Sequence, residues 1–311
     1  MKPLSFIETN DLGGVLAALS ESGARPIAGG SDLLGELKEG SQSYERLVSL
    51  AGLDSLRRIE RRDGGGLQIG AMVTLSDLEL GAELTGPYHI LGEAARGVAT
   101  PEVRNQGTLG GNLCQRPRCL HYRSGLVECL KKCGSSCPAI ETPYQNYLSI
   151  FGGAGCYAVH ASDLAPPLIA LDAEVVIAGP SGSRTLAVES FFASPEHDVT
   201  RENVLAPGEI VTSVTLPALP PGWRGAYSKA RERTAGDFPI VSAAIGFDVS
   251  DGRMRRVRIV LGGVAATPLR CRDAETLLEG QSASDELARR AAGAALAGAR
   301  PLEHNAFKVD L

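Results

Sequence analysis

The distribution of cysteines is the feature that most constrains this chain. Six of the seven cysteines in its 311 residues lie between residues 114 and 156, in a segment without any sustained apolar period. A chain of this length can bury an adequate core without disulfides. Crowded thiols in such a chain are typical of metal or cluster ligation. The segment therefore predicts a metal-binding loop and not a disulfide framework.

The cysteine spacing leaves the kind of metal open. Thiolates select zinc or iron-sulfur clusters. Zinc sites usually combine two closely spaced cysteine pairs, whereas the only comparable spacings here are Cys114 to Cys119 and the series Cys129, Cys133 and Cys137. Dispersed ligands favour an iron-sulfur cluster wrapped by one irregular loop. Zinc and purely structural cysteines remain alternatives at this point.

Two glycine turns are candidate phosphate cradles. One lies at residues 28–34 (AGGSDLL) and the other at residues 108–112 (TLGGN). Backbone N–H groups reach phosphate oxygens where side chains do not intervene, and a helix that begins there adds its positive end. Ser31 supplies a further donor. Paired glycines also form ordinary tight turns, but two such motifs together indicate a diphosphate.

Other nucleotide motifs fit poorly. The chain has no G-x-x-x-x-G-K-[ST] loop, which argues against a nucleotide triphosphatase. Residues 153–158 (GAGCYA) have the form of a dinucleotide fingerprint, but Pro166 and Pro167 follow where that motif needs a long helix.

Charge and hydropathy exclude further classes. The net charge is -5, and the longest basic run is residues 57–62 (RRIERR), so we expect no nucleic-acid partner. No segment approaches the roughly 20 apolar residues of a membrane span. The first residues lack an apolar h-region, so we expect no export signal on this chain.

The pattern of elements predicts an α+β fold. Residues 1–179 alternate short strands and helices, with Ser76 and Glu79 as a capping box. Residues 179–182 (GPSG) are the predicted domain boundary. After it come strands at 210–216, 240–249 and 256–262 and an alanine-rich helix at 286–299, which predict a domain with a mainly antiparallel sheet.

Five ordered motifs resemble the FAD-binding subunit of the molybdenum hydroxylase (xanthine dehydrogenase) family. They are residues 28–34 (AGGSDLL), 104–113 (RNQGTLGGNL), 162–166 (SDLAP), 262–270 (GGVAATPLR) and 305–308 (NAFK). The resemblance implies a two-part FAD-binding domain of the molybdopterin-dehydrogenase flavoprotein type at residues 1–179, with subdomains at about 1–57 and 58–179. A smaller α+β domain of the CO dehydrogenase flavoprotein type would occupy residues 183–311.

The cysteine loop, at about residues 114–157, resembles that of a minority of the family whose flavin subunit carries an extra [4Fe-4S] cluster. These are the bacterial periplasmic-type aldehyde oxidoreductases and 4-hydroxybenzoyl-CoA reductase. The short interval from Cys119 to Cys129 is more similar to the aldehyde oxidoreductases. Cys114 and Cys133 are left as spares. The implied cluster ligands are Cys119, Cys129, Cys137 and Cys156.

The resemblance also assigns flavin contacts. The pyrophosphate would lie over the two glycine turns, Asp163 would approach the ribose or adenine, and Val211 with Lys229 would complete the pocket. From its position alone, Lys229 is equally an exposed strand-end lysine, and Asp163 a helix cap. The implied contacts are Pro26, Ile27, Ala28, Gly29, Gly30, Ser31, Asp32, Leu33, Leu34, Thr108, Gly110, Gly111, Asn112, Asp163, Val211 and Lys229.

The implied function is electron transfer within a heterotrimeric aldehyde oxidoreductase. Electrons would come from a large subunit with the molybdenum cofactor through two [2Fe-2S] clusters of a small subunit, and leave through FAD to an external acceptor. No residue of this chain need be catalytic, because the redox chemistry belongs to the cofactor. Alternatives are the β subunit of a 4-hydroxybenzoyl-CoA reductase and a zinc-stabilised nucleotide-binding scaffold. The location is the cytoplasm or the periplasm, since a partner could carry the export signal.

Overall fold

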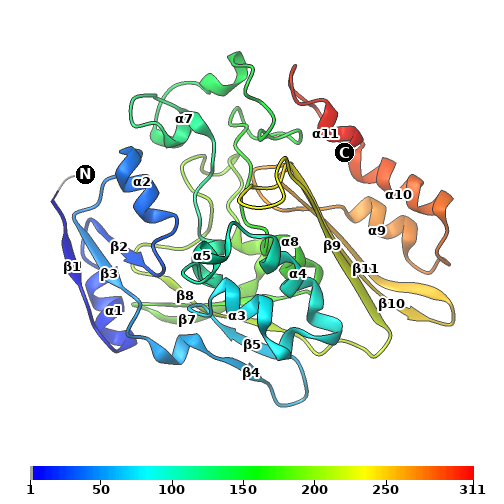
Figure 1. The fold of residues 1–311 in the computed structure, drawn as a ribbon, viewed down its shortest axis with the longest axis horizontal. Coiled ribbons are helices and arrows are strands. Elements are labelled where there is room, and N and C mark those ends of the chain that lie inside the picture. Colours follow the sequence, from blue (N-terminus) through cyan, green and yellow to red (C-terminus); the bar gives the residue numbers. More distant parts are fainter. Residues whose placement is uncertain (1–2) are drawn as a thin grey trace.

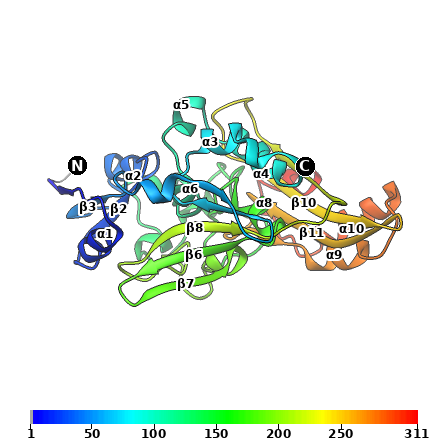
Figure 2. The ribbon, with the colours of Figure 1, turned by 90° about the horizontal axis from the view of Figure 1, so that it is seen from below.

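The computed structural model describes residues 3–311 and contains three β-sheets. The sheets follow one another along the longest axis of the molecule, with the N-terminal sheet at one end and the C-terminal sheet at the other (Figures 1 and 2). No helix in the described residues is long and apolar enough to cross a membrane.

The N-terminal unit is a small parallel sheet with the strand order β1-β3-β2. The Asp11 side chain begins the first helix by accepting a hydrogen bond from the Gly14 amide at 2.8 Å. Val15 and Val48 are fully buried and hold helix to sheet. The elements are β1 (Ser5–Ile7), α1 (Leu12–Leu19), β2 (Ala24–Ile27), α2 (Leu33–Glu39) and β3 (Arg46–Ser49).

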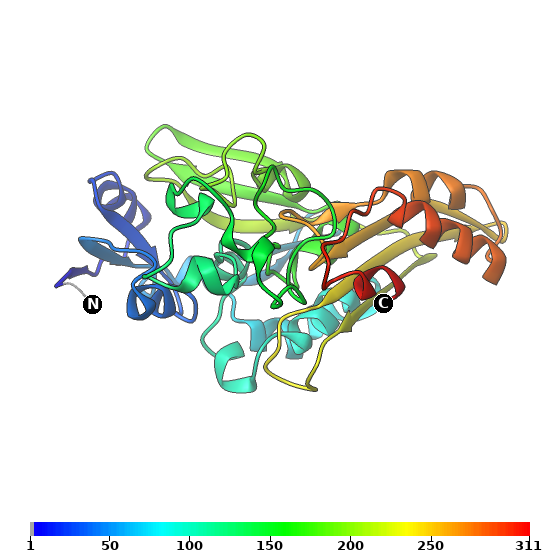
Figure 3. The same ribbon diagram turned by 90° about the horizontal axis from the view of Figure 1, so that it is seen from above.

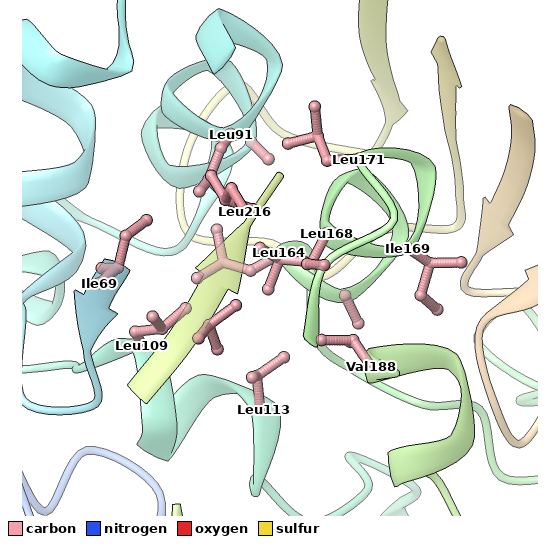
Figure 4. Close-up of a cluster of buried hydrophobic side chains, with 14 of the residues drawn as sticks. Ile69, Leu91, Leu109, Leu113, Leu164, Leu168, Ile169, Leu171, Val188 and Leu216 are labelled. Carbon is pink, nitrogen blue, oxygen red and sulfur yellow. The ribbon is translucent and has the colours of Figure 1, made fainter. Parts of the chain in front are cut away.

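The central unit is a five-stranded antiparallel sheet of order β4-β5-β8-β6-β7. Figure 4 shows its core, in which Ile69 and Leu216 of the sheet meet Leu91, Leu109 and Leu164 from the helical side. The strands are β4 (Ile59–Arg61), β5 (Leu67–Gly70), β6 (Glu174–Gly179), β7 (Gly182–Ala187) and β8 (Ile210–Leu216). The helices are α3 (Leu75–Leu80), α4 (His89–Gly97), α5 (Pro101–Arg104), α6 (Leu109–Leu113) and α8 (Ala165–Ala170).

The cysteine segment, residues 114–157, contains little regular structure. Its elements are α7 (Leu120–Arg123) and two 3₁₀ turns, Leu130–Lys132 and Pro138–Glu141. Figure 3 shows the segment, in teal to green, as irregular loops between the N-terminal unit and the C-terminal helices. The predicted irregular loop is therefore present.

The C-terminal unit is a four-stranded antiparallel sheet of order β12-β11-β10-β9, with α9 packed on β11 and α10 on α9. This confirms the predicted fold class. The strands are β9 (Trp223–Ala230), β10 (Val241–Ser250), β11 (Arg253–Gly262) and β12 (Leu269–Arg270). The helices are α9 (Arg272–Leu278), α10 (Asp285–Leu296) and α11 (Phe307–Asp310).

Two details differ from the sequence-based expectations. Strand β8 pairs with β5 and β6, although it was expected in the C-terminal sheet. Residues 179–182 form the tight turn of the β6–β7 hairpin, where Gly179 pairs with Gly182. Glycine and proline mark hairpin turns as well as linkers. The domain boundary remains a prediction, and the strand pairing favours residues 217–222 over residues 179–182.

The capping box before α3 was also misassigned. It uses Thr74 and Asp77 in place of Ser76 and Glu79. The Thr74 hydroxyl accepts from the Asp77 amide at 3.1 Å, and the Asp77 carboxylate accepts from the Thr74 amide at 3.1 Å. Both pairs have the three-residue spacing that the motif requires, so sequence alone could not separate them.

Candidate functional site

A cavity of about 530 Å³ opens between the N-terminal unit and the central sheet. We call it the glycine cavity. Its walls are the turn from β2 to α2, the turn that begins α6, and residues 201–211, which lead into β8. The two glycine motifs, which are about 80 residues apart in the sequence, therefore face one space.

Close backbone contact explains the glycines of these turns. A Cβ on Gly29 would lie 1.6 Å from the carbonyl oxygen of Gln106, so the two turns abut without room for a side chain. Gly30 has a φ of +71°, a conformation that L side chains rarely adopt. A Cβ on Gly110 would lie 2.9 Å from Cβ of Ala71. The cavity wall here is backbone, as a phosphate cradle requires.

The helices contribute less to the phosphate cradle than the two glycine motifs predict. α2 has seven residues and α6 has five, so their dipoles are short. The Thr108 hydroxyl accepts a hydrogen bond from the Gly111 amide at 3.2 Å and thereby caps α6. The turn amides and the Ser31 hydroxyl are the principal donors offered to a ligand.

Most of the predicted flavin contacts line the glycine cavity. They are Pro26, Ile27, Ala28, Gly29, Gly30, Ser31, Asp32, Leu33, Thr108, Gly110, Gly111 and Val211. Leu34, Asn112, Asp163 and Lys229 do not line it. Leu34 is 41% exposed. The buried Asn112 accepts a hydrogen bond from the Ser162 hydroxyl at 2.5 Å and thus ties α6 to the start of α8.

Asp163 and Lys229 form a buried ion pair. The Asp163 carboxylate accepts from Lys229 Nζ at 2.8 Å and from the Tyr227 hydroxyl at 2.7 Å. Lys229 Nζ also donates to the Gly97 carbonyl at 2.9 Å, so it joins β9 to the end of α4. Burial raises the pKa of Asp163, and the Lys229 ammonium opposes that rise. Asp163 does not cap α8, because the Ser162 hydroxyl accepts from the Ala165 amide.

Sequence reasoning missed several charged residues of the glycine cavity. Glu36, Arg116 and Glu202 line it, and Arg116 Nε lies 2.7 Å from Glu202 Oε2. The RPRC motif at residues 116–119 was the only available signal, since nothing marks residues 201–210. Cys114 also lines this cavity, and burial raises the pKa of its thiol to about 12.

Asp32 connects this cavity to the cysteine segment. Its carboxylate accepts from the Arg116 amide at 2.8 Å and from the guanidinium groups of Arg118 at 2.9 Å and Arg123 at 2.5 Å. The acid that ends the first glycine motif is thus neutralised by the loop, and it is not free to repel a phosphate.

A second, smaller cavity of about 10 Å³ lies within the cysteine segment. We call it the cysteine cavity. Its walls include all four predicted ligands, Cys119, Cys129, Cys137 and Cys156, together with Tyr122 and Lys131. Burial raises the pKa of the Cys119 and Cys156 thiols. Cys133 is exposed and does not line it.

The four thiols are not arranged around a single ion. Within residues 3–311, no three side chains of His, Cys, Asp or Glu converge closely enough to hold one metal ion. All seven cysteines are free thiols in the structure. The four sulfur atoms thus share a wall without sharing one coordination point.

His160 follows the cysteine segment in the sequence. It is buried and meets the Phe192 ring edge to face, with ring centroids 4.4 Å apart. Burial lowers the pKa of its imidazole to about 4, so it is uncharged at neutral pH. This placement agrees with a packed histidine.

The fold and the two facing glycine turns define an FAD-binding flavoprotein. Residues 2–219 match the FAD binding domain in molybdopterin dehydrogenase, and residues 225–309 match the CO dehydrogenase flavoprotein C-terminal domain. The chain belongs to the FAD-binding medium subunits of the molybdenum hydroxylase family.

Individual relatives resemble the chain over nearly its whole length. It is 35% identical over 300 residues to the aldehyde oxidoreductase FAD-binding subunit PaoB of Escherichia coli (strain K12), covering 95% of this chain and 90% of that protein. It is 29% identical over 294 residues to the carbon monoxide dehydrogenase medium chain of Hydrogenophaga pseudoflava, covering 94% of this chain and 85% of that protein. A solved structure of carbon monoxide dehydrogenase from Hydrogenophaga pseudoflava, which lacks the Mo-pyranopterin moiety of its cofactor, superposes with a TM-score of 0.78 at 27% identity and covers 100% of this chain and 94% of that chain.

Proposed function

We propose that this chain is the FAD- and [4Fe-4S]-binding electron-transfer subunit of a heterotrimeric aldehyde oxidoreductase. One observation carries the proposal: the four cysteines that the family resemblance selects line one cavity, next to a cavity walled by two glycine turns. The partners are a large molybdenum-cofactor subunit and a small subunit with two [2Fe-2S] clusters.

The volume of the glycine cavity and the backbone turns that form its wall are both suited to FAD. Its volume of about 530 Å³ lies in the range of cofactor pockets. Ser31 and the turn amides would hold the pyrophosphate, and Gly29 and Gly30 keep side chains out of its path. FAD, when bound, supplies the chemistry of accepting electrons and releasing them to an external acceptor. This chain's residues bind and orient it.

The cysteine cavity suits a cluster better than zinc. Thiolates are the ligands of both, but a zinc ion needs its ligands at one point, and the described residues offer no such point. An iron-sulfur cluster spreads its ligands over several irons. The space of about 10 Å³ has room for about one water, so the irregular loop would have to widen to admit a cluster. Cys119, Cys129, Cys137 and Cys156 are the proposed ligands.

The substrate class is inferred from similarity. The relative at 35% identity is named an aldehyde oxidoreductase subunit, and the interval from Cys119 to Cys129 is short, as in that group. We therefore propose aromatic aldehydes as substrates, with electrons flowing toward FAD and then to the acceptor.

The test is to purify the chain with its co-purifying partners and to mix the complex rapidly with an aromatic aldehyde. Flavin and iron-sulfur absorbance should bleach together, acid precipitation should release FAD, and metal analysis should find about eight irons per complex, of which about four belong to the cluster of this chain. A colourless zinc protein would establish the scaffold alternative. Reduction of 4-hydroxybenzoyl-CoA without aldehyde oxidation would establish the reductase alternative.

A further inference from the structure

Two acidic side chains of the glycine cavity are bonded to two side chains of the cysteine cavity. Glu36 accepts from the Tyr122 hydroxyl at 2.5 Å, and Glu202 accepts from Lys131 Nζ at 2.8 Å. Glu36 and Glu202 line the first cavity, whereas Tyr122 and Lys131 line the second. The wall between the two cavities is therefore one polar layer.

Lys131 is the cation of this layer that faces the thiols. Its side chain is 4% exposed, and its Nζ also donates to the Val199 carbonyl at 2.9 Å. The partner Glu202 is shared with Arg116, whose Nε lies 2.7 Å from Oε2. Two cations on one carboxylate leave a formal excess of one positive charge. A buried charge held by such partners stays in place and acts through a low local dielectric.

Lys131 lines the same cavity as the four cysteines, and none of the residues that line this cavity is Asp or Glu. The other charged groups near the layer are Glu36, which is bonded to Tyr122, and Asp32 with Arg118 and Arg123, and none of these charged groups lines the cysteine cavity. Lys131 is thus the charge directed at the cysteine cavity.

We propose that Lys131 is a positioning residue that raises the reduction potential of the cluster held by the four cysteines, and that Glu202 holds it there while partly offsetting its charge. The inference rests on the proposed function. A cluster held by these cysteines would gain one negative charge on one-electron reduction, and the Lys131 ammonium at the cavity wall would favour that reduced form.

The neighbouring Lys132 provides a matched control. Its Nζ donates to the backbone carbonyls of His121 at 3.1 Å and Ser124 at 2.5 Å, and its side chain does not line the cysteine cavity. Loss of Lys132 removes the same formal charge from the same 3₁₀ turn without removing a cation from the cavity wall.

The experiment is a dithionite titration of the purified complex with redox mediators, in which the reduced cluster is followed by electron paramagnetic resonance. Iron and FAD are measured on each sample. Lys131→Met should lower the equilibrium constant for one-electron reduction of the cluster by about tenfold, which lowers its reduction potential by about 59 mV. Glu202→Gln should raise the reduction potential. Lys131→Arg, which keeps the charge, and Lys132→Met should both leave the potential near the wild-type value.

Each outcome decides the inference. An unchanged potential in an iron-replete Lys131→Met complex overturns it, as does an equal fall in Lys132→Met. If Lys131→Met loses the cluster of this chain, the sign of the Glu202→Gln shift decides, and a downward shift overturns the inference. A wild-type complex with only the roughly four irons of two [2Fe-2S] clusters overturns the proposed function itself, which distinguishes the two failures.

Discussion

The glycine cavity and the cysteine cavity are built on opposite principles. The first is walled by backbone at turns that strands and helices hold in place, and its shape depends on side chains that are absent at Gly29 and Gly30. The second is walled by side chains of an irregular loop, in which Leu120 is 67% and Leu126 98% exposed. One site is preformed by the fold, and the other depends on what its side chains bind.

Because of this difference, different kinds of substitution should abolish ligand binding at the two sites. A backbone cradle is destroyed by adding atoms, because nothing nearby can yield. A thiol site is destroyed by removing one ligand atom, while the surrounding fold retains its own core. The two sites share the polar layer of Glu36, Tyr122, Lys131 and Glu202, so damage to one site can alter the other.

The largest expected effect is on the glycine cavity. Gly29→Val should abolish FAD binding, since its Cβ would lie 1.6 Å from the Gln106 carbonyl oxygen and drive the two turns apart. Gly30→Val should do the same through its φ of +71°. The measurement is FAD released by acid from folded protein, with folding checked by circular dichroism.

Gly293→Ala is the matched control for the glycine variants. Gly293 lies inside α10, and a Cβ there would meet no atom within 4 Å. The change should stabilise the chain by about 0.5–1 kcal/mol, because alanine loses less backbone entropy in a helix. Normal FAD content in folded Gly29→Val protein would mean that the abutting turns do not form the cradle.

The next effect tests the cysteine cavity. Replacement of Cys119, Cys129, Cys137 or Cys156 by Ser should remove about four irons per complex, the content of one [4Fe-4S] cluster, because each thiol lines the shared cavity. Cys114→Ser and Cys133→Ser should keep it, since neither residue lines that cavity. Iron and FAD are measured together on each variant. Iron loss from Cys133→Ser with retention in Cys137→Ser would show that the ligand set is misassigned.

The backbone turns of the glycine cavity could be predicted from the sequence, whereas the charged residues of its wall could not. The motifs AGGSDLL and TLGGN are local, so the turns and the residues that line the cavity could be read from them. The bond between Glu36 and Tyr122 spans 86 positions, and the one between Lys131 and Glu202 spans 71. No local pattern encodes such contacts, because they follow from how the segments pack.

In the fold, too, local features could be predicted from the sequence and long-range contacts could not. The antiparallel C-terminal sheet could be predicted from successive strands with partial alternation. The partners of β8 could not, because it is a central strand buried on both faces and reads as a continuous apolar run. Asp163 and Lys229 were assigned to the flavin pocket by resemblance, but the structure pairs them with each other outside the glycine cavity.

A third, smaller effect tests whether that pair belongs to the glycine cavity. Lys229→Met should lower the free energy of unfolding by about 3–5 kcal/mol, because Asp163 is left buried without its cation. The folded fraction should keep its FAD. Chemical denaturation and flavin content are the measurements. The double variant Asp163→Asn/Lys229→Met should recover part of the loss. Loss of FAD from well-folded Lys229→Met protein would mean that Lys229 belongs to the flavin site.

The smallest effect concerns the anchor at the end of the cysteine segment. Lys308 of α11 is buried, and its Nζ donates to the carbonyls of Leu148 and Gly263 at 2.7 Å each. No acid pairs with it among residues 3–311, and burial lowers the pKa of its ammonium from 10.5 to about 7.

A lowered lysine pKa makes stability depend on pH with a definite sign. Between pH 7 and 10.5 the unfolded chain binds a proton that the folded chain does not, so the free energy of unfolding rises with pH, by at most about 1.4 kcal/mol per unit. Below pH 7 the cost of burying the charge is fully present. Denaturation at pH 7 to 9.5 should show wild type gaining stability relative to Lys308→Met, which cannot titrate there. A difference that stays flat across this range would mean that the two carbonyls keep Lys308 protonated, and that the cysteine segment is anchored by a charge.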